Sequence, residues 1–459
     1  MTKLQIACLI TVLLVPVSRA AQQDLIRSGT GIGQARTRLA VANFRAGSDT
    51  ADLTRTFDDT LWNDLDYAGI FDMVSRSFYP ESLPSTPADL MQPLQAPIAS
   101  TRSRSRSQQP PELKLSEWAK PPASAHMLAF GNAARNGSQI TIQGWLVDTS
   151  NNTEPVVFGK RYDDDATPEA ARQIAHKFAD EIIYRLGGGI PGIAESKIVF
   201  IRTMKPRVKE LWIMDYDGSN QKQITHLNSI CLTPAISQDG TQVAFTTYAK
   251  GNPDIMVFSL LTNKPLAFFN RAGLNTTPTW SPDGSKLAFT SSVTGDPEIY
   301  VGDSRGEHTK RLTFVRGVDI SPAWNPKTGN QIAFVSDRSG KPQIWTMDAD
   351  GTGATQVVNG GNQALDPAWS PNGRLLAFTW DAGGEYDIYL MDVATQQYVQ
   401  MTKDLRRNEH PSWSPDNRHI VFQSNRTGTA QIWSMLADGT KPRQLTFQGE
   451  NSEPVWSSK

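Results

Sequence analysis

The sequence predicts two domains, a small N-terminal α/β domain and a C-terminal six-bladed all-β propeller with WD40-like repeats. Three observations predict the propeller: a repeat of about 44 residues, strand-like segments at fixed places in each repeat, and an incomplete repeat at either end of the array. A repeat of about 40–50 residues with strand content is typical of a β-propeller, in which each repeat forms one four-stranded blade.

A proline followed two residues later by an aromatic or aliphatic residue marks each repeat. In the clearest repeat, Trp280 lies in the expected inner strand, and residues 281–284 (Ser-Pro-Asp-Gly) have the composition of a tight turn. The apolar run 287–289 is the expected second strand, and residues 298–301 and 311–313 are the third and fourth. The marking prolines are Pro234, Pro278, Pro322, Pro367, Pro411 and Pro454.

The phase of the repeats predicts how the ring closes. The array opens at 196–200 with a second strand and ends at 453–456 with a first strand. The propeller is therefore expected over residues 190–459, with the C-terminal strand 453–459 completing the blade that begins at Lys197. Such closure removes open sheet edges, which would otherwise pair with other chains.

The N-terminus has the composition of a secretory signal peptide over residues 1–20. Lys3 supplies the positive charge, residues 4–15 are apolar, and Ser18-Arg19-Ala20 fits a cleavage site. The mature chain is expected to be exported and soluble, without a transmembrane segment, and to begin with a flexible segment at 21–36. Since Cys8 leaves with the signal peptide, Cys231 remains as a single cysteine and no intramolecular disulfide is expected.

Residues 37–189 predict the α/β domain. Thr167 is expected to cap a helix that starts at Pro168, and the glycines at 187–189 end it as a hinge. Residues about 80–122, rich in Pro, Ser and Gln, predict a disordered loop that contains three arginines. The expected strands are 38–44, 71–74, 126–134, 139–147 and 156–162, the other helix is 52–66, and the three arginines are Arg102, Arg104 and Arg106.

Composition and motifs argue against nucleic-acid binding and catalysis. The formal net charge is −1, or −3 once Lys3 and Arg19 leave, so we expect no nucleic-acid partner, although the arginine loop keeps a polyanion patch open. The chain lacks the Gly-x-Ser-x-Gly motif of a hydrolase, and its histidines have no metal-ligand spacing. We therefore expect a protein that is not an enzyme and holds no cofactor or metal. The alternatives are a propeller-type peptidase, a polysaccharide-lyase relative, or an exported peptide- or glycan-binding propeller.

The order of signal peptide, small α/β domain, glycine hinge and six blades with Ser-Pro-Asp-Gly turns resembles the periplasmic TolB family over essentially the whole mature chain. The resemblance implies a monomeric scaffold of the Tol–Pal system, which supports outer-membrane integrity and constriction at cell division and which some bacteriocins exploit. It also implies that the propeller binds the lipoprotein Pal and that a segment near the mature N-terminus binds TolA. The matching N-terminal residues are Asp24, Leu25, Ile26 and Arg27. Leu274 and Ser321 stand where several family members have a histidine and a glutamate.

In each blade, the loop before the first strand and the loop after the second strand lie on one face of the ring. This face is the expected Pal-binding surface, and four carboxylates of its first set of loops are expected to converge near the channel mouth, where they would suit a basic or hydrogen-bond-donating partner. The first set contains Asn275, Thr276, Thr277, Asp319, Asp366, Glu409, His410 and Glu453. The second set contains Tyr248, Arg338, Asp381 and Arg426.

Overall fold

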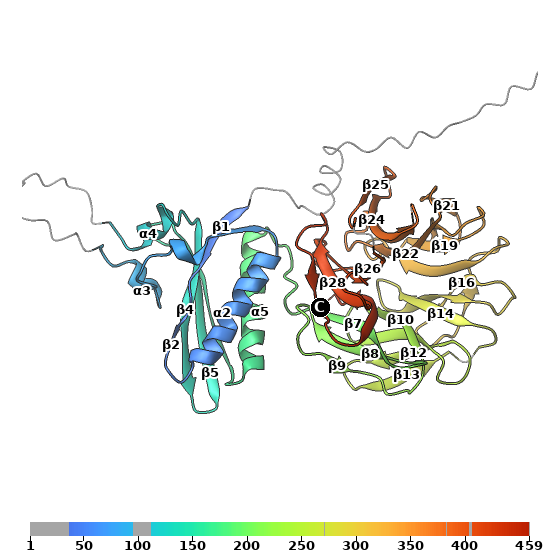
Figure 1. Cartoon of the computed structure of the whole chain (residues 1–459), viewed down its shortest axis with the longest axis horizontal. Coiled ribbons are helices and arrows are strands. Elements are labelled where there is room, and N and C mark those ends of the chain that lie inside the picture. Colours follow the sequence, from blue (N-terminus) through green and yellow to red (C-terminus); the bar gives the residue numbers. More distant parts are fainter. Residues whose placement is uncertain (1–35, 95–111, 270, 382, 404–405, 459) are drawn as a thin grey trace, which may run out of the picture.

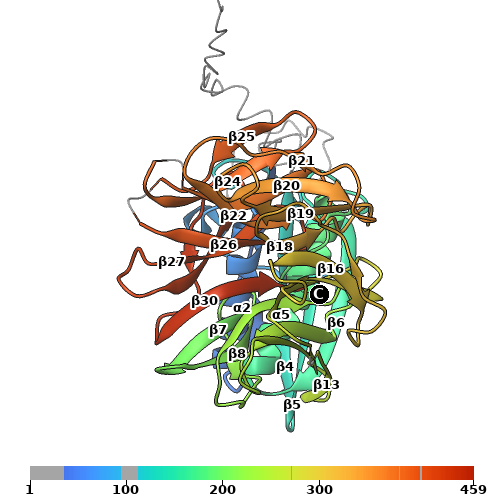
Figure 2. The ribbon, with the colours of Figure 1, turned by 90° about the vertical axis from the view of Figure 1, so that its right-hand side faces the viewer.

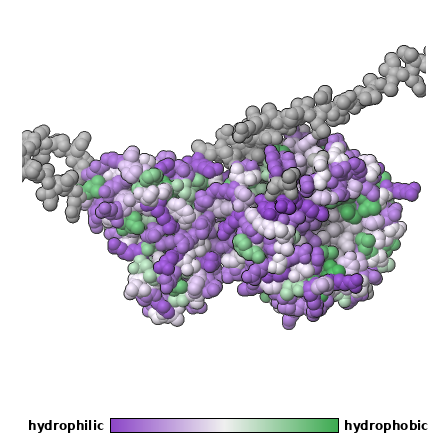
Figure 3. Space-filling model, in the orientation of Figure 1, coloured by the Kyte–Doolittle hydropathy of each residue, from purple (hydrophilic) through white to green (hydrophobic). Residues whose placement is uncertain are grey.

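A computed structural model describes residues 36–94 and 112–458, apart from 270, 382 and 404–405. It contains an N-terminal α/β domain followed by a six-bladed β-propeller, as the sequence predicts (Figure 1). The two domains form separate lobes that meet over a narrower waist (Figure 3). The predicted signal peptide and the segment with residues 24–27 lie outside the described residues.

The N-terminal domain is a mixed sheet covered on one face by two long helices. The strand order is β3-β1-β4-β5-β6, with β2 beside β4; β1 runs parallel to β3 and β4, and β4, β5 and β6 are antiparallel. Helices α2 (Ala51–Tyr67) and α5 (Pro168–Leu186) lie between this sheet and the propeller (Figure 1). The strands are β1 (Thr37–Val41), β2 (Arg45–Ala46), β3 (Phe71–Met73), β4 (Met127–Asn136), β5 (Gln139–Asp148) and β6 (Val156–Asp165).

Two features of its sequence explain helix α5, a capped N-terminus and an apolar stripe. The Thr167 hydroxyl accepts a hydrogen bond from the Ala170 N–H, and Pro168 occupies the first turn, where no intrahelical donor is needed. Its apolar stripe at helical spacing is buried against α2 and the sheet. Phe178 is fully buried at the centre of this core, where it packs edge-on to Phe158.

The prediction of one disordered loop over about 80–122 is wrong for both of its ends. A 3-10 turn η1 (Arg76–Phe78) precedes the region, which contains the short helices α3 (Pro87–Leu90) and α4 (Leu115–Ala119). These helices form because a few apolar residues within the polar segment build a small core, which the overall composition did not reveal. Leu90, Leu115 and Trp118 are buried, and Tyr79 packs beside Trp118. Residues 95–111, with the three arginines, lie outside the described residues.

Each blade is a four-stranded antiparallel sheet whose inner strand lines the central channel. Blade 1 contains β30 (Glu450–Trp456), β7 (Lys197–Lys205), β8 (Val208–Asp215) and β9 (Lys222–Gln223). Blade 2 contains β10 (Cys231–Ile236), β11 (Gln242–Thr247), β12 (Asp254–Ser259) and β13 (Lys264–Phe268). Blade 3 contains β14 (Asn275–Trp280), β15 (Lys286–Ser291), β16 (Glu298–Asp303) and β17 (Lys310–Arg311).

The other three blades repeat this plan. Blade 4 contains β18 (Asp319–Trp324), β19 (Gln331–Ser336), β20 (Gln343–Asp348) and β21 (Thr355–Gln356). Blade 5 contains β22 (Gln363–Trp369), β23 (Leu375–Asp381), β24 (Tyr386–Asp392) and β25 (Gln397–Gln400). Blade 6 contains β26 (Asn408–Trp413), β27 (His419–Ser424), β28 (Gln431–Leu436) and β29 (Arg443–Gln444). The second strand of each blade contains a fully buried phenylalanine. These residues are Phe200, Phe245, Phe289, Phe334, Phe378 and Phe422.

The C-terminal strand β30 closes the ring by pairing with β7, the first strand of the array (Figure 2). Trp456 is buried at this seam, and its indole N–H donates to the Ser196 hydroxyl at 2.7 Å. Ser457 continues the contact through its N–H, which donates to the Lys197 carbonyl at 2.8 Å. The closure unites residues more than 250 positions apart in one blade.

The N-terminal domain packs on the turns of blades 6 and 1. Tyr67, the last residue of α2, accepts a hydrogen bond from His419 at its carbonyl and donates its hydroxyl to Ser434, at 3.0 and 2.7 Å. Lys441 forms an ion pair with Asp66 at 2.8 Å. His419 and Lys441 lie in or beside the turns between first and second and between third and fourth strands, and Ser434 lies within β28.

Asp180 fastens the linker between the domains. Its carboxylate accepts hydrogen bonds from the N–H groups of Ala194 and Glu195 at 3.0 and 3.3 Å. Burial raises the pKa of this carboxyl to about 7, although the two N–H groups act in the opposite direction. Gly192 passes so close that a Cβ atom there would lie 1.9 Å from the Asp180 carboxylate.

Removing the closing strand should destabilise the propeller strongly. Deletion of residues 453–459 removes about four ladder hydrogen bonds, worth about 1 kcal/mol each, and exposes the pocket that Trp456 fills. The variant Trp456→Ala alone should cost about 3–5 kcal/mol. Calorimetric melting would measure both, with deletion of residues 458–459 as the control that leaves the strand intact. A 453–459 deletion that melts like this control would contradict the closure.

A double-mutant cycle tests the linker contact. Gly192→Ala should lower the free energy of unfolding by about 1–3 kcal/mol, because the added methyl group meets the Asp180 carboxylate. In an Asp180→Ala background the same substitution should cost little, since the obstructing group is gone. Urea denaturation of the four proteins would measure this coupling; a cost of Gly192→Ala that is equal in both backgrounds would contradict it.

Candidate functional site

The two faces of the ring differ in what they contact. The turns between first and second and between third and fourth strands lie on the face where the N-terminal domain packs. The loops that lead into the inner strands and the loops between second and third strands lie on the opposite face, which we call the open face. All the interdomain contacts described above come from the first face, so the open face is the surface available to a partner.

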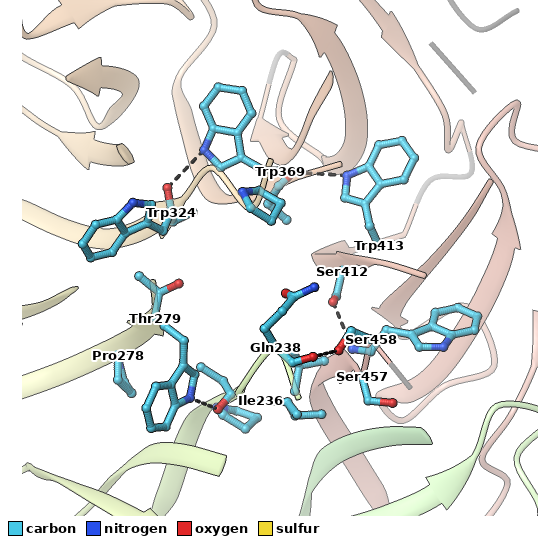
Figure 4. Close-up of a pocket in the computed structure, with 18 of the residues that line it drawn as sticks. Ile236, Gln238, Pro278, Thr279, Trp324, Trp369, Ser412, Trp413, Ser457 and Ser458 are labelled. Atoms are coloured by element: carbon cyan, nitrogen blue, oxygen red, sulfur yellow. Dashed lines mark hydrogen bonds between the residues drawn. The ribbon is translucent and has the colours of Figure 1, made fainter. Parts of the chain in front are cut away.

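A central channel of about 580 Å³ runs between the six inner strands. Its end toward the N-terminal domain has a layer of tryptophans, of which Trp324, Trp369 and Trp413 are visible in Figure 4. The indole N–H of Trp369 donates to the Ala323 carbonyl of the preceding blade at 3.1 Å, and that of Trp413 donates to Ala368 at 3.1 Å. These bonds tie neighbouring blades together, so the tryptophans have a structural role.

Toward the open face, each inner strand contains one residue with a left-handed backbone, directly before the marking proline. The φ angles of these residues lie between 48° and 54°, and each sits at a β-bulge in the pairing of the first and second strands. Non-glycine residues rarely adopt this conformation, at a cost of about 1 kcal/mol or more each. The six residues, named the αL ring, are Thr233, Thr277, Ser321, Asp366, His410 and Glu453.

Hydrogen bonds between blades hold the αL ring in place. The N–H of Thr277 donates to the Thr246 hydroxyl and that of His410 donates to the Thr379 hydroxyl, both at 3.1 Å. In each pair, the acceptor lies on the second strand of the preceding blade. The N–H of Glu453 donates the equivalent hydrogen bond to the Gln423 side-chain oxygen at 3.1 Å. These bonds offset part of the backbone strain and fix the ring side chains at the channel.

Side chains divide the αL ring into two halves. Blades 2, 3 and 4 contribute the hydroxyl groups of Thr233, Thr277 and Ser321, while the other three contribute Asp366, His410 and Glu453. The channel mouth is therefore neutral and polar on one side and charged on the other.

His410 is the centre of the charged half. Its Nδ1 lies 3.3 Å from one carboxylate oxygen of Asp366. The other oxygen of Asp366 accepts a hydrogen bond from the Thr379 hydroxyl at 2.9 Å. Burial lowers the pKa of His410, but the negative charges of Asp366 and Glu453 outweigh it, so the pKa is raised above its ordinary value. The two flanking carboxylates thus favour the protonated form of His410.

Of the predicted site residues, four belong to the αL ring: Thr277, Asp366, His410 and Glu453. The expectation that four carboxylates converge at the mouth is wrong for Asp319, which is fully buried in an ion pair with Arg338 at 2.6 Å. Glu409 lies beside the ring but contacts Arg407 and Gln423. Only Asp366 and Glu453, of these four, line the channel.

Several predicted site residues hold the blades together instead. Asn275 is fully buried and donates to Asp254 of the preceding blade at 2.8 Å. Arg338 and Arg426 lie over the tryptophans of the adjacent strand and bond the start of an inner strand, and Asp381 is also buried. Because these side chains are polar, the sequence predicted that they would be exposed. In the structure, polar side chains around the start of an inner strand are enclosed by two blades. Tyr248 is more than one third exposed, and Thr276 is partly exposed.

An apolar rim on the open face was not predicted. Phe314 and Phe447 are 70% and 72% exposed, and each follows a Leu-Thr pair that comes directly after a fourth strand. The repeat contains the signal for this rim, because the equivalent positions in other blades are polar, as at His226, Asn359 and Lys403. The remaining exposed members of the rim are Met204, Tyr248, Val293, Val315 and Val318.

The described residues show no catalytic constellation at the mouth. Within residues 36–94 and 112–458, apart from 270, 382 and 404–405, no serine or cysteine side chain forms a hydrogen bond with the His410 imidazole. Cys231 is buried, and burial raises the pKa of its thiol to about 12, which leaves it unreactive. Within the same residues, no helix is long and apolar enough to cross a membrane.

Comparisons with known proteins agree on one family. A family model described as the TolB beta propeller domain matches residues 184–366 and 352–459. The chain is 39% identical over 198 residues to a Protein TolB homolog of Chlorobium chlorochromatii, a match covering 43% of each chain. It is 32% identical over 278 residues to a Tol-Pal system protein TolB of Desulfosudis oleivorans, covering 60% of this chain and 57% of that protein. The matched stretches thus span about half the length of these curated relatives.

Among solved structures, TolB from Acinetobacter baumannii superimposes with a TM-score of 0.72. The match covers 93% of this chain and 98% of that chain, at 23% sequence identity. At this identity the likeness shows a shared two-domain fold.

The pKa of His410 should depend on its carboxylate neighbours. Asp366→Asn should lower it, because one of the negative charges that stabilise the imidazolium is removed. A histidine whose pKa is raised in the folded state stabilises the fold at low pH, and this stabilisation is lost as the pH rises through the folded-state pKa. Because Asp366→Asn lowers that pKa, the variant should lose the stabilisation at a lower pH than the wild type. NMR titration of the imidazole would measure the change, with His308, bonded to Asp303 on the other face, as the internal control. Unchanged titration of His410 would contradict the charged half of the ring.

Proposed function

The chain belongs to the TolB β-propeller family, and from this premise we propose that it is a non-catalytic protein-interaction scaffold of the Tol–Pal system. In this role it is exported to the periplasm through the N-terminal signal peptide, acts as a monomer, and links the lipoprotein Pal to TolA. It thereby supports outer-membrane integrity and constriction at cell division.

The open face is the proposed Pal-binding surface. The observation that carries this assignment is the combination of an exposed apolar rim, with Phe314 and Phe447 as its most exposed aromatic members, around a polar channel mouth. Exposed aromatic residues beside polar groups are typical of protein–protein interfaces, where a few such side chains provide most of the binding energy. The position of the N-terminal domain on the other face supports the same assignment.

The charged half of the αL ring suits a partner that inserts a basic or hydrogen-bond-donating group. Asp366 and Glu453 offer carboxylate oxygens at the mouth, and the three hydroxyl residues across the channel offer further donors and acceptors. In this proposal, aromatic residues of the rim provide affinity, while the ring sets which polar group the partner presents.

TolA binding is proposed for the N-terminal segment, through Asp24, Leu25, Ile26 and Arg27. This assignment rests on the family resemblance of the segment. Docking of the segment on the protein body is proposed to weaken Pal binding, so that its removal strengthens it.

The alternative is an exported propeller that binds a peptide or glycan within the channel. The volume of about 580 Å³ and a lining of tryptophans with a few polar side chains favour this second candidate enough to include it in the test.

Calorimetric titration of the mature protein, residues 21–459, with soluble Pal from the same organism would test the scaffold role. We expect micromolar or tighter binding, strengthened in a version that starts at Arg36. Phe314→Ala and Phe447→Ala should each weaken binding about tenfold, or about 1.4 kcal/mol. Asp366→Lys should weaken it as well, because it reverses a charge at the mouth.

Matched controls lie on the opposite face of the ring. Leu261→Ala removes a comparably exposed apolar side chain, and Glu307→Lys makes the same charge change; neither should alter the affinity. Equal losses in the controls and in the open-face variants would reject the open face as the binding surface. No detectable binding by any version would reject the Pal assignment and favour a small ligand of the channel.

A further inference from the structure

A cluster of potential metal ligands lies between the two domains, on the side of the ring opposite the open face. One ring nitrogen of His176 and one carboxylate oxygen each of Asp215 and Asp217 lie within 4.8 Å of one another. His176 belongs to α5 of the N-terminal domain, whereas Asp215 ends β8 in blade 1 and Asp217 lies in the following turn. The cluster therefore forms only where the domains meet.

His176 has an unused nitrogen in this cluster. Its side chain is 4% exposed, and its Nδ1 lies 2.7 Å from the Asp64 carboxylate of α2. Within the described residues, the buried Nε2 has no hydrogen-bond partner. Since Nδ1 is engaged by Asp64, Nε2 is the nitrogen available to a ligand. A buried polar atom without a partner is costly, so a bound ion would remove that cost.

Asp64 contacts His176 in the way that carboxylates contact metal-binding histidines. Metal-binding histidines commonly donate their other N–H to a carboxylate, which fixes the tautomer and the ring orientation. Asp64 is itself held by the hydroxyl of Tyr216, whose ring meets the imidazole edge-on with centroids 5.7 Å apart. The imidazole is thus oriented by groups from both domains.

The two aspartates keep free coordination capacity. Asp215 Oδ1 accepts a hydrogen bond from Lys197 at 2.6 Å and retains a second lone pair. Its Oδ2 accepts hydrogen bonds from Asn220 at 2.6 Å and from the Ser219 hydroxyl at 3.4 Å. Asp217 accepts a hydrogen bond from the Ser219 N–H, and its other oxygen is 3.8 Å from Arg172.

The donor atoms at the cluster suit a cation. The carboxylates of Asp215 and Asp217 face two cations, Lys197 and Arg172, and the carboxyl of Asp64 lies at the other ring nitrogen of His176. One imidazole nitrogen and two carboxylates form a donor set that Zn²⁺ accepts, with a water molecule as a fourth ligand.

From this geometry we infer that His176, Asp215 and Asp217 form a binding site for a divalent transition-metal ion, with Zn²⁺ as the best match, which fastens the N-terminal domain to blade 1. The inference is independent of the Pal-binding proposal, because it involves the opposite side of the ring. A metal bound to both domains stabilises their contact by the free energy of binding.

Zinc titration of the tag-free, chelator-treated mature protein would test the site by calorimetry, with Co²⁺ absorbance as a second readout. His176→Asn places an amide near the position of Nδ1, so it can keep the contact with Asp64 while removing Nε2. Asp217 lies in a turn, and Asp217→Asn keeps an acceptor for the Ser219 N–H. We therefore expect this variant to fold even where His176→Asn fails to fold. We expect one zinc ion per chain in the wild type with a raised melting temperature, and at least a tenfold loss of affinity in each variant.

A second histidine cluster provides the matched control. Asp303, Glu307 and His308 also group on the surface of blade 3, so His308→Ala should leave the interdomain binding unchanged. An anomalous-scattering peak at the zinc edge, between α5 and the turn after β8, would place the ion. Zinc binding that survives in His176→Asn and Asp217→Asn, that disappears only in His308→Ala, or that is absent from the wild type would overturn the inference.

Discussion

The ladder between β30 and β7 joins the two ends of the propeller, and the same seam holds the N-terminal domain. Trp456 donates to Ser196 on the propeller side, while His419 in the adjacent blade donates to Tyr67 of α2. Trp456, Tyr67 and Tyr216 belong to one buried apolar cluster. Ring closure and domain docking therefore share a core, and without the closing strand both lose their packing.

Strand β30 also connects the two faces of the ring. Glu453 lies in the αL ring toward the open face, and three residues later Trp456 lies at the interdomain seam, a distance of about 10 Å along a strand. The strand is thus part of both the proposed partner surface and the domain contact. Near the same seam, the cluster of His176, Asp215 and Asp217 adds a polar contact between the domains.

Six equivalent backbones give a channel whose two sides differ in chemistry. Each blade bends its inner strand at the same bulge and holds a left-handed residue there, which sets where the side chain points. The side chains themselves vary from hydroxyl to carboxylate to imidazole. Repetition provides the scaffold, and the departures from it, at the αL ring and at Phe314 and Phe447, provide the features that can distinguish a partner.

The sequence by itself determined the propeller, the number of blades and their closure, because a 44-residue period, the turn residues and the phase of the strands are local properties. It also predicted which loops share a face and placed Thr277, Asp366, His410 and Glu453 among the site residues. Only the tertiary structure decided that Asn275 and Asp319 are buried, because burial depends on neighbouring blades. The same holds for the helices within 80–122 and for the union of His176 with Asp215, since those contacts arise from packing between segments distant in sequence.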